Sequence, residues 1–247
     1  MGLFPVLDTV TIRAITLDLD DTLWPIWPAI VRAEQKQHEW LTRHAPRTAV
    51  RYPLLAMRAL RVELMQSHPE LAHDFAAQRR LTLAHALREC GEDIALAGMA
   101  FEVFTAHRNA VDLFPGVTDA LARLASHFPV AALTNGSADL ARIGIDGHFV
   151  FQLGAHEHGA AKPDASIFHA ACARLGLTPE SVLHVGDDPE LDVLGAHRAG
   201  LRTAWINTDA ECWPLPQLQP DFSVRNLSEL AAALLDEPSI LPGAQRV

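Results

Sequence analysis

Short apolar runs alternate with helix-like runs in the second half of the chain, and this alternation restricts the fold more than any other feature. Four apolar runs have the length of strands: residues 129–134, 149–153, 181–185 and 202–206. A helix-like run separates each of these from the next, and a last one follows at 227–235. Parallel strands need long crossover connections, usually helices. The pattern therefore predicts an α/β fold, a doubly wound parallel sheet with helices on both faces.

A fifth strand is expected near the start of the chain. Residues 12–19 are apolar and β-branched at first and end in acids, which is typical of a buried strand. The segment 22–28 that follows contains Pro25 and Pro28. Two prolines so close together predict an irregular connection here.

A long helical insertion is expected between this strand and the others. Residues 29–108 look helical throughout, and near their end one stripe recurs at spacings of three and four: Ile94, Ala97, Phe101, Phe104 and Arg108. We therefore expect a helical domain of residues 25–109, inserted into a core domain of residues 1–24 and 110–247.

Composition and charge exclude several classes of function. The net charge of −10 and the lack of a basic stripe argue against a nucleic-acid-binding protein. Charged residues interrupt every apolar run before it reaches membrane-spanning length. The three cysteines are widely spaced and predict no disulfide framework. We expect a cytoplasmic protein without a membrane or nucleic-acid partner, and a monomer or a homodimer.

Polar residues cluster where four of the expected strands end. In order along the chain, the clusters are Asp18, Asp20, Asp21 and Thr22; Thr134, Asn135, Gly136 and Ser137; Lys162; and Gly186, Asp187, Asp188 and Asp192. Ligands of open parallel sheets bind beyond the carboxyl ends of the strands, so these clusters should meet. Carboxylates so close together call for a cation, and oxygen ligands favour Mg²⁺. The second cluster offers donors at an expected helix N-terminus, and Lys162 adds a positive charge, which together suit an anion.

These clusters resemble the four ordered motifs of the haloacid dehalogenase-like (HAD) hydrolase superfamily. The first motif, Asp-x-Asp-x-Thr, matches residues 18–22, and the second, a strand ending in Thr, matches residues 132–136. The third is the Lys of residues 161–164, and the fourth is the Gly-Asp-Asp run with a further Asp in residues 185–192. The resemblance implies a Rossmann-like core whose helical insertion is a C1 cap domain.

The resemblance also implies roles for the first motif. Asp18 is expected to attack phosphorus and form an aspartyl-phosphate. Asp20 is expected to act as general acid and then general base, with its backbone carbonyl on the metal. Thr22 is expected to hold the side chain of Asp20, although an ordinary turn hydroxyl is the alternative.

The other motifs complete the implied site. Thr134, with the N–H groups of Asn135 and Gly136, is expected to bind the phosphoryl oxygens, and the alternative for Thr134 is a helix N-cap. Lys162 is expected to neutralise the phosphoryl group and Asp18. Asp18, Asp20, Asp187 and Asp188 are the expected Mg²⁺ ligands, with the direct ligand of the last pair left open. Asp192 is expected to orient Lys162 or to be a first-turn helix acid.

Asp20 favours phosphoryl transfer over the other reactions of the superfamily. The dehalogenase branch lacks the second Asp of the first motif, because no leaving alkoxide needs a proton. A sugar-phosphate mutase shares all four motifs and stays an alternative. A non-catalytic phosphate- or protein-binding relative is a further alternative, but Asp18, Asp20 and Lys162 are all retained.

The expected substrate is a small-molecule phosphate ester, because a cap that closes over the strand ends leaves no room for a macromolecule. The sequence also resembles the bacterial flavin mononucleotide and riboflavin-pathway phosphatases in its Leu-Asp-Asp-Thr-Leu start and in the run at 183–188. Flavin mononucleotide and 5-amino-6-(5-phospho-D-ribitylamino)uracil are therefore candidate substrates. Trp24 and Trp27 follow the first motif and either pack at the cap hinge or stack on a planar substrate.

Overall fold

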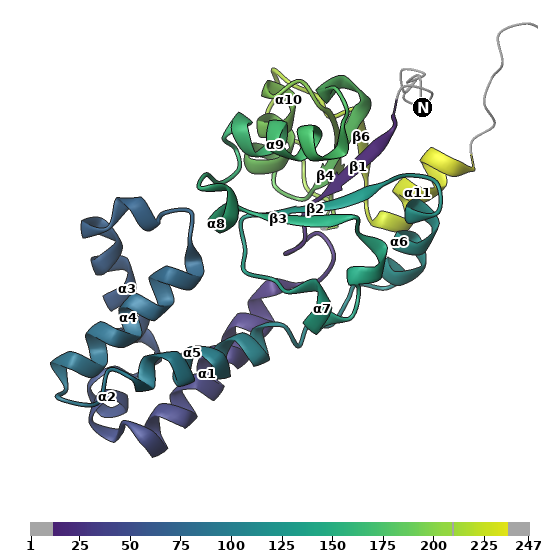
Figure 1. Cartoon of the computed structure of the whole chain (residues 1–247). Helices are drawn as coiled ribbons and strands as arrows, with labels where there is room; N and C mark the ends of the chain where they lie inside the picture. The colour runs from purple at the N-terminus through teal and green to yellow at the C-terminus, as the bar shows by residue number, and fades with distance from the viewer. Residues whose placement is uncertain (1–11, 209, 237–247) are drawn as a thin grey trace, which may run out of the picture.

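The structure is a computed structural model that describes residues 12–208 and 210–236. A parallel sheet in the order β3-β2-β1-β4-β5-β6 forms its core (Figure 1). The strands are β1 (Ala14–Leu17), β2 (Val130–Thr134), β3 (Phe151–Gly154), β4 (Val182–Gly186), β5 (Arg202–Ile206) and β6 (Phe222–Val224). The order confirms the doubly wound parallel sheet, and β6 extends it by one short strand that the sequence pattern missed.

Helices cover both faces of the sheet. The helices of the core are α6 (Val117–Ala125), α7 (Leu140–Ile143), α8 (Ala155–His158), α9 (Ala165–Leu175), α10 (Gly195–Arg198) and α11 (Leu227–Leu235). Apolar side chains of α6 and α11 pack on one face, and those of α9 and α10 pack on the other. The strands between them, β1, β2 and β4, are buried along their whole length, which explains their nearly continuous apolar sequence.

A separate group of helices lies between β1 and β2 in the chain and beside the sheet in space (Figure 1). Its members are α1 (Ile26–His44), α2 (Pro46–Arg51), α3 (Leu54–Ser67), α4 (Phe75–Glu89) and α5 (Leu96–Arg108). They have an apolar core of their own, which includes Leu41, Leu83 and Phe104. We refer to α1–α5 as the cap. Its outer bounds lie next to those expected from the sequence, and its independence as a domain stays a prediction.

The connection from β1 to the cap is more regular than two prolines suggest. Helix α1 already begins at Ile26, after Pro25, and Pro28 lies within its first turn. Proline is tolerated there because the first N–H groups of a helix have no intrahelical partner. The carboxylate of Asp21 accepts a hydrogen bond from the N–H of Ile26, at 3.0 Å, and so satisfies one of these groups.

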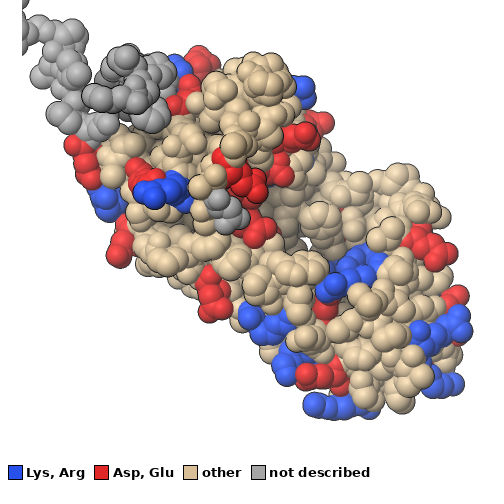
Figure 2. Space-filling model, turned by 180° about the vertical axis from the view of Figure 1, so that it is seen from behind, with Lys and Arg blue, Asp and Glu red and all other residues tan. Residues whose placement is uncertain are grey.

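The sheet topology brings three strand ends together. Leu17, the last residue of β1, pairs with Ala132 of β2 on one side and with Val185 of β4 on the other. The strand order reverses at this point, which is where ligands bind in sheets of this kind. Figure 2 shows the molecule hollowed between the core and the cap. Among the described residues, no helix is both long and apolar enough to cross a membrane.

Candidate active site

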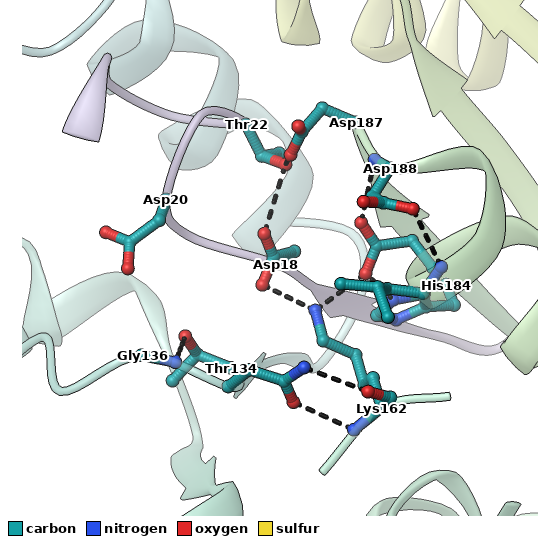
Figure 3. A network of polar contacts seen from close by, with 12 residues as sticks. Asp18, Asp20, Thr22, Thr134, Gly136, Lys162, His184, Asp187 and Asp188 are labelled. Atoms are coloured by element: carbon teal, nitrogen blue, oxygen red, sulfur yellow. Dashed lines mark hydrogen bonds and ion pairs between the residues drawn. The ribbon is translucent and has the colours of Figure 1, made fainter. Parts of the chain in front are cut away.

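Asp18 and Lys162 form the centre of the site (Figure 3). Asp18 follows β1 directly, and the Nζ atom of Lys162 donates to its Oδ1 atom at 2.5 Å. The same Nζ atom lies 2.6 Å from Oδ1 of Asp192. All three residues are buried. As expected, Asp192 lies next to Lys162, and Lys162 lies next to Asp18.

A buried histidine, His184, is hydrogen-bonded to this centre through Asp192. Within β4, His184 places Nε2 3.1 Å from Oδ1 of Asp192 and Nδ1 2.9 Å from the hydroxyl of Thr16. Burial lowers the pKa of His184, so we treat the ring as neutral. Gly186 makes room for this arrangement, because a Cβ atom at this position would lie 2.2 Å from Cγ of Asp192.

Thr22 contacts a different aspartate from the one expected. Its hydroxyl donates to Oδ1 of Asp187 at 2.7 Å and lies 3.4 Å from Oδ2 of Asp18, so the expected bond to Asp20 is wrong. The side chain of Asp20 instead accepts hydrogen bonds from Arg108 and Trp24. Trp205 of β5 donates its indole N–H to the backbone carbonyl of Asp187, at 2.8 Å, and so fixes the loop after β4.

Asp187 and Asp188 differ clearly in their surroundings. Oδ1 of Asp188 accepts the N–H groups of Glu190 and Leu191, both at 2.8 Å, and so caps the π-helix Pro189–Leu194. Asp187 instead faces Asp18 and, with Asp192, forms a group of carboxylates whose oxygens lie within 4.8 Å of one another. Of the expected pair, Asp187 is therefore the residue placed for a direct metal contact.

The charges of this group leave negative charge in excess. Burial raises the pKa of Asp18 well above its ordinary value; Lys162 opposes this effect, and the charges of Asp192 and Asp187 add to it. Burial and the charge of Asp192 raise the pKa of Asp187 to about 7. Burial tends to raise the pKa of Asp192 as well, but the charge of Lys162 outweighs burial and holds this pKa well below its ordinary value. A hard divalent cation with oxygen ligands fits this group.

Asp20 lies at the edge of the cavity, with its carboxylate pointing away from Asp18 (Figure 3). The Nη2 atom of Arg108, at the end of α5, lies 2.7 and 2.6 Å from the two carboxylate oxygens. Trp24 donates its indole N–H to the same carboxylate at 3.0 Å. Glycine at position 136 makes room for this carboxylate, because a Cβ atom there would lie 2.3 Å from Oδ2 of Asp20 and would displace it.

The loop after β2 is not a helix N-terminus. Helix α7 begins only at Leu140 and is capped by Asp139, so the expected helical anion site and the N-cap alternative for Thr134 are both wrong. The hydroxyl of Thr134 instead accepts the N–H of Gly136 at 2.9 Å. Serine and threonine form such local turns readily, and these turns compete with helix formation. Thr134 still lines the cavity.

Asn135 positions the lysine rather than pointing its side chain at a ligand. Its amide nitrogen donates to the carbonyl oxygen of Lys162 at 3.0 Å, and its amide oxygen accepts the N–H of Lys162 at 2.8 Å. These two bonds tie the loop after β2 to the loop after β3. The expected phosphate contact of Asn135, through its backbone N–H group, stays a prediction.

Sequence reasoning missed the role of Arg108. This side chain is 2% exposed, and its Nη1 atom has no hydrogen-bond partner among the described residues. A signal was present, because Arg108 continues the stripe of Phe101 and Phe104 that faces the cap interior. A charge in line with a buried face indicates a buried partner. The sequence pattern does not identify that partner.

The site opens into a cavity of about 660 Å³ between the core and the cap. Its lining includes side chains of all four motifs and also Trp27, which is 60% exposed. Trp24 is fully buried, so it packs at the hinge and cannot stack on a substrate. Arg58 lies over the Trp27 ring, 4.9 Å from its centroid.

Comparison with known proteins identifies similar sequences over most of the chain. A family model described as haloacid dehalogenase-like hydrolase matches residues 12–200. The chain is 31% identical to the 5-amino-6-(5-phospho-D-ribitylamino)uracil phosphatase YigB of Escherichia coli (strain K12), over 90% of this chain and 96% of the relative. It is 34% identical to a phosphoserine phosphatase of Thermus thermophilus, over 63% of this chain and 64% of that one.

Comparison of structures finds the same fold. A crystal structure of 2-haloacid dehalogenase from Pseudomonas syringae pv. Tomato DC3000 superposes with a TM-score of 0.86. It is 38% identical in sequence and covers 91% of this chain and 98% of its own. The core and the cap are therefore both represented in this relative.

Proposed function

The chain belongs to the haloacid dehalogenase-like hydrolase family, as the sequence predicts, and on that premise we propose that it is a Mg²⁺-dependent phosphatase of small phosphomonoesters. The class, a hydrolase of phosphoric monoesters, agrees with the phosphatases among its relatives. The cofactor, the intermediate and the substrate are parts of the proposal.

One observation carries the proposal. Four segments that are far apart in the sequence place Asp18, Asp20, Thr134, Lys162 and Asp187 around a single cavity. A carboxylate nucleophile, an acid, a hydroxyl donor, a buried cation and a metal-binding carboxylate are the groups that phosphoryl transfer through an enzyme-bound intermediate requires.

The first half of the reaction forms the intermediate. The carboxylate of Asp18 attacks phosphorus, the bond from phosphorus to the alcohol oxygen breaks, and protonated Asp20 gives its proton to that oxygen. Lys162 holds the attacking carboxylate and neutralises charge beside it. Because Asp20 points away from Asp18 and forms a salt bridge with Arg108 here, its side chain has to turn towards the substrate and take up a proton before this step.

The second half releases phosphate. Asp20, now a carboxylate, takes a proton from a water molecule, and the resulting hydroxide attacks phosphorus of the aspartyl-phosphate. The bond between phosphorus and the Asp18 oxygen breaks, which restores Asp18 and returns Asp20 to its protonated form. Thr134 would bind a phosphoryl oxygen throughout, because its hydroxyl accepts the N–H of Gly136 and keeps its own proton to donate to the ligand.

Asp18, Asp187 and the backbone carbonyl of Asp20 would hold the Mg²⁺ ion. When bound, Mg²⁺ offsets the negative charge of the carboxylates and of the phosphoryl group, so that both can approach. The excess of acids over cations in this group and its all-oxygen donor set support this assignment.

Two observations favour a substrate with a planar ring as the first to test. The relative that matches 90% of this chain is named for 5-amino-6-(5-phospho-D-ribitylamino)uracil, and Trp27 is among the residues that line the cavity. Flavin mononucleotide is the second such candidate. Phosphoserine, the substrate named for the Thermus relative, belongs in the same panel.

A screen for phosphate release over a panel of metabolite phosphoesters, with Mg²⁺ present, tests the proposal. We expect phosphate from at least one small ester and none from the Asp18→Asn variant. Isomerisation of a sugar phosphate without phosphate release would indicate the mutase instead. Binding without any turnover would indicate the non-catalytic relative.

The likeness to the Pseudomonas syringae 2-haloacid dehalogenase favours a dehalogenase as the second candidate. Asp20 argues against it, because a departing halide needs no proton. Incubation with 2-chloropropionate separates the two, since a phosphatase releases no chloride. Chloride release at a rate above that of any phosphoester would reverse the assignment.

A further inference from the structure

The cap contributes a partly buried cluster of charges to the lining of the cavity that also holds Asp18. Glu34 of α1, whose side chain is 7% exposed, contacts three arginines. The Nε atom of Arg58 lies 2.6 Å from its Oε2 atom, and Arg61 and Arg79 place nitrogens 3.3 and 3.2 Å from its Oε1 atom. Helices α1, α3 and α4 thus each contribute to this group, which we call the arginine cluster.

The arginine cluster carries positive charge in excess. Burial raises the pKa of Glu34, but the arginines outweigh this effect and hold it below the ordinary value, so Glu34 is ionised. Burial and the charge of Arg61 lower the pKa of Arg79 to about 10, so Arg79 is charged at neutral pH. Three guanidinium groups therefore share one carboxylate, and Glu34 is the single acid that the cap contributes to the described lining of the cavity.

The guanidinium groups are held in place before any ligand binds. Arg79 lies over the ring of Phe104, 3.8 Å from its centroid, and Arg58 lies over the ring of Trp27. Stacking and the bonds to Glu34 limit the motion of both planes, which lowers the entropy lost on binding. All three arginines line the same 660 Å³ cavity as Asp18 and Lys162, and in Figure 2 basic side chains of the cap border the hollow.

We propose that Arg58, Arg61 and Arg79 bind a second oxyanionic group of the substrate, a carboxylate or a phosphate, while the scissile phosphate lies at Asp18. Guanidinium groups bind both oxyanions through paired hydrogen bonds. The inference rests on the proposed function and narrows its substrate class to esters with a second negative charge, such as phosphoserine. It therefore disfavours the two planar-ring candidates, which carry no second carboxylate or phosphate. A neutral end would leave two positive charges of this partly buried cluster without a counter-charge.

A purely structural role for the arginine cluster is the alternative. One arginine already neutralises Glu34, and Arg58 alone makes the closest contacts. Arg61 approaches Glu34 only at 3.3 Å. A side chain that served only to join helices would gain little from this longer contact, so Arg61 is the residue to test.

Matched esters test the inference. Glycerol 1-phosphate and 3-phosphoglycerate differ at the carbon end, where one has a hydroxymethyl group and the other a carboxylate; fructose 6-phosphate and fructose 1,6-bisphosphate form the pair for phosphate. We expect kcat/KM of the wild type to be at least about tenfold higher for the more anionic member of one pair. Arg61→Gln should reduce that ratio at least about fivefold, mainly through KM. Arg61→Lys, which retains the charge, should recover part of it.

The control removes a charge elsewhere on the cap. Lys36 of α1 is exposed and pairs with Glu39, so Lys36→Gln should leave the ratio unchanged. A wild-type ratio of one or less for both pairs, or a ratio insensitive to Arg61→Gln, would overturn the inference and leave the phosphatase intact.

Binding measurements distinguish a failure of the inference from a failure of the proposed function. If none of the four esters is hydrolysed, the proposed function fails for these substrates, and calorimetry on Asp18→Asn with Mg²⁺ decides the inference by itself. Tighter binding of 3-phosphoglycerate than of glycerol 1-phosphate, or of fructose 1,6-bisphosphate than of fructose 6-phosphate, would support it. Equal or weaker binding of the more anionic member in both pairs would reject it.

Discussion

The core and the cap each hold a cluster of charged side chains, buried in the core and partly buried in the cap, and the two clusters are opposite in composition. In the core, Lys162 lies between Asp18 and Asp192, with Asp187 beside them. In the cap, Glu34 lies among three arginines. Both clusters line one cavity, so one end of it is acidic and the other basic.

The difference indicates what each end binds. Burial of unpaired charge costs free energy, so the excess charge of a buried cluster points to a ligand of the opposite sign. Excess carboxylate in the core calls for a metal ion, and excess guanidinium in the cap calls for an oxyanion. Substitutions in each cluster and removal of the metal test the two clusters separately.

Asp18→Asn should give the largest effect. An amide cannot attack phosphorus at a useful rate, so we expect kcat to fall at least about a thousandfold. Phosphate release measures the loss, and circular dichroism with urea unfolding checks that the fold is retained. Activity above a hundredth of the wild type would disprove the role of Asp18 as the nucleophile.

Removal of the metal should come next. Chelation by EDTA leaves the carboxylates and the phosphoryl group to repel one another, so we expect a loss of about a hundredfold or more. Added Mg²⁺ should restore the rate, which phosphate release again measures. Turnover that survives exhaustive chelation would remove the metal from the core cluster.

Glu34→Gln tests the excess of positive charge in the cap. The variant leaves three arginines without a counter-charge, so we expect the free energy of unfolding to fall by about 1–3 kcal/mol, with partial exposure of the arginines limiting the cost. Urea unfolding measures this change. Glu39→Gln, on the same helix but exposed, is the matched control and should unfold like the wild type. Equal stability of both variants would show that the cap cluster is not under strain.

Arg108→Lys should give the smallest effect, at the boundary of the two parts. Lysine keeps the charge next to Asp20 but loses the guanidinium group that contacts both carboxylate oxygens, so we expect kcat/KM to fall about tenfold. Trp24→Phe, which removes only one hydrogen bond to the same carboxylate, should reduce it less. A faster Arg108→Lys enzyme would show that the ion pair restrains Asp20 instead of positioning it.

The core followed from the sequence more completely than the cap did. Alternating patterns predicted five of the strands, since each strand is apolar enough to be recognised by itself. Strand β6 was missed because Phe222–Val224 is short and only partly buried. In the cap, where only a helical insertion was predicted, helices α1 and α3 end shortly before Pro46 and Pro69, because a proline interrupts the hydrogen bonds of the preceding helix.

The side-chain partners within the site were predicted less well. Thr22 binds Asp187, which lies 165 residues away, and Asp20 binds Arg108, which lies 88 residues away. A motif specifies which residue types gather at one edge of the sheet. It does not specify which of several neighbouring donors reaches a given carboxylate, because that depends on how distant elements pack.

The sequence alone determined that a parallel sheet would bring its acidic strand ends together, since the carboxyl ends of parallel strands share one edge. The meeting of Asp18 with Lys162 follows from that rule. The tertiary structure alone decided the basic end of the cavity. Glu34 and its arginines come from three helices, 24 to 45 residues apart, and no periodic pattern marks them. Only the packing of α1, α3 and α4 turns them towards one cavity and leaves their charge in excess.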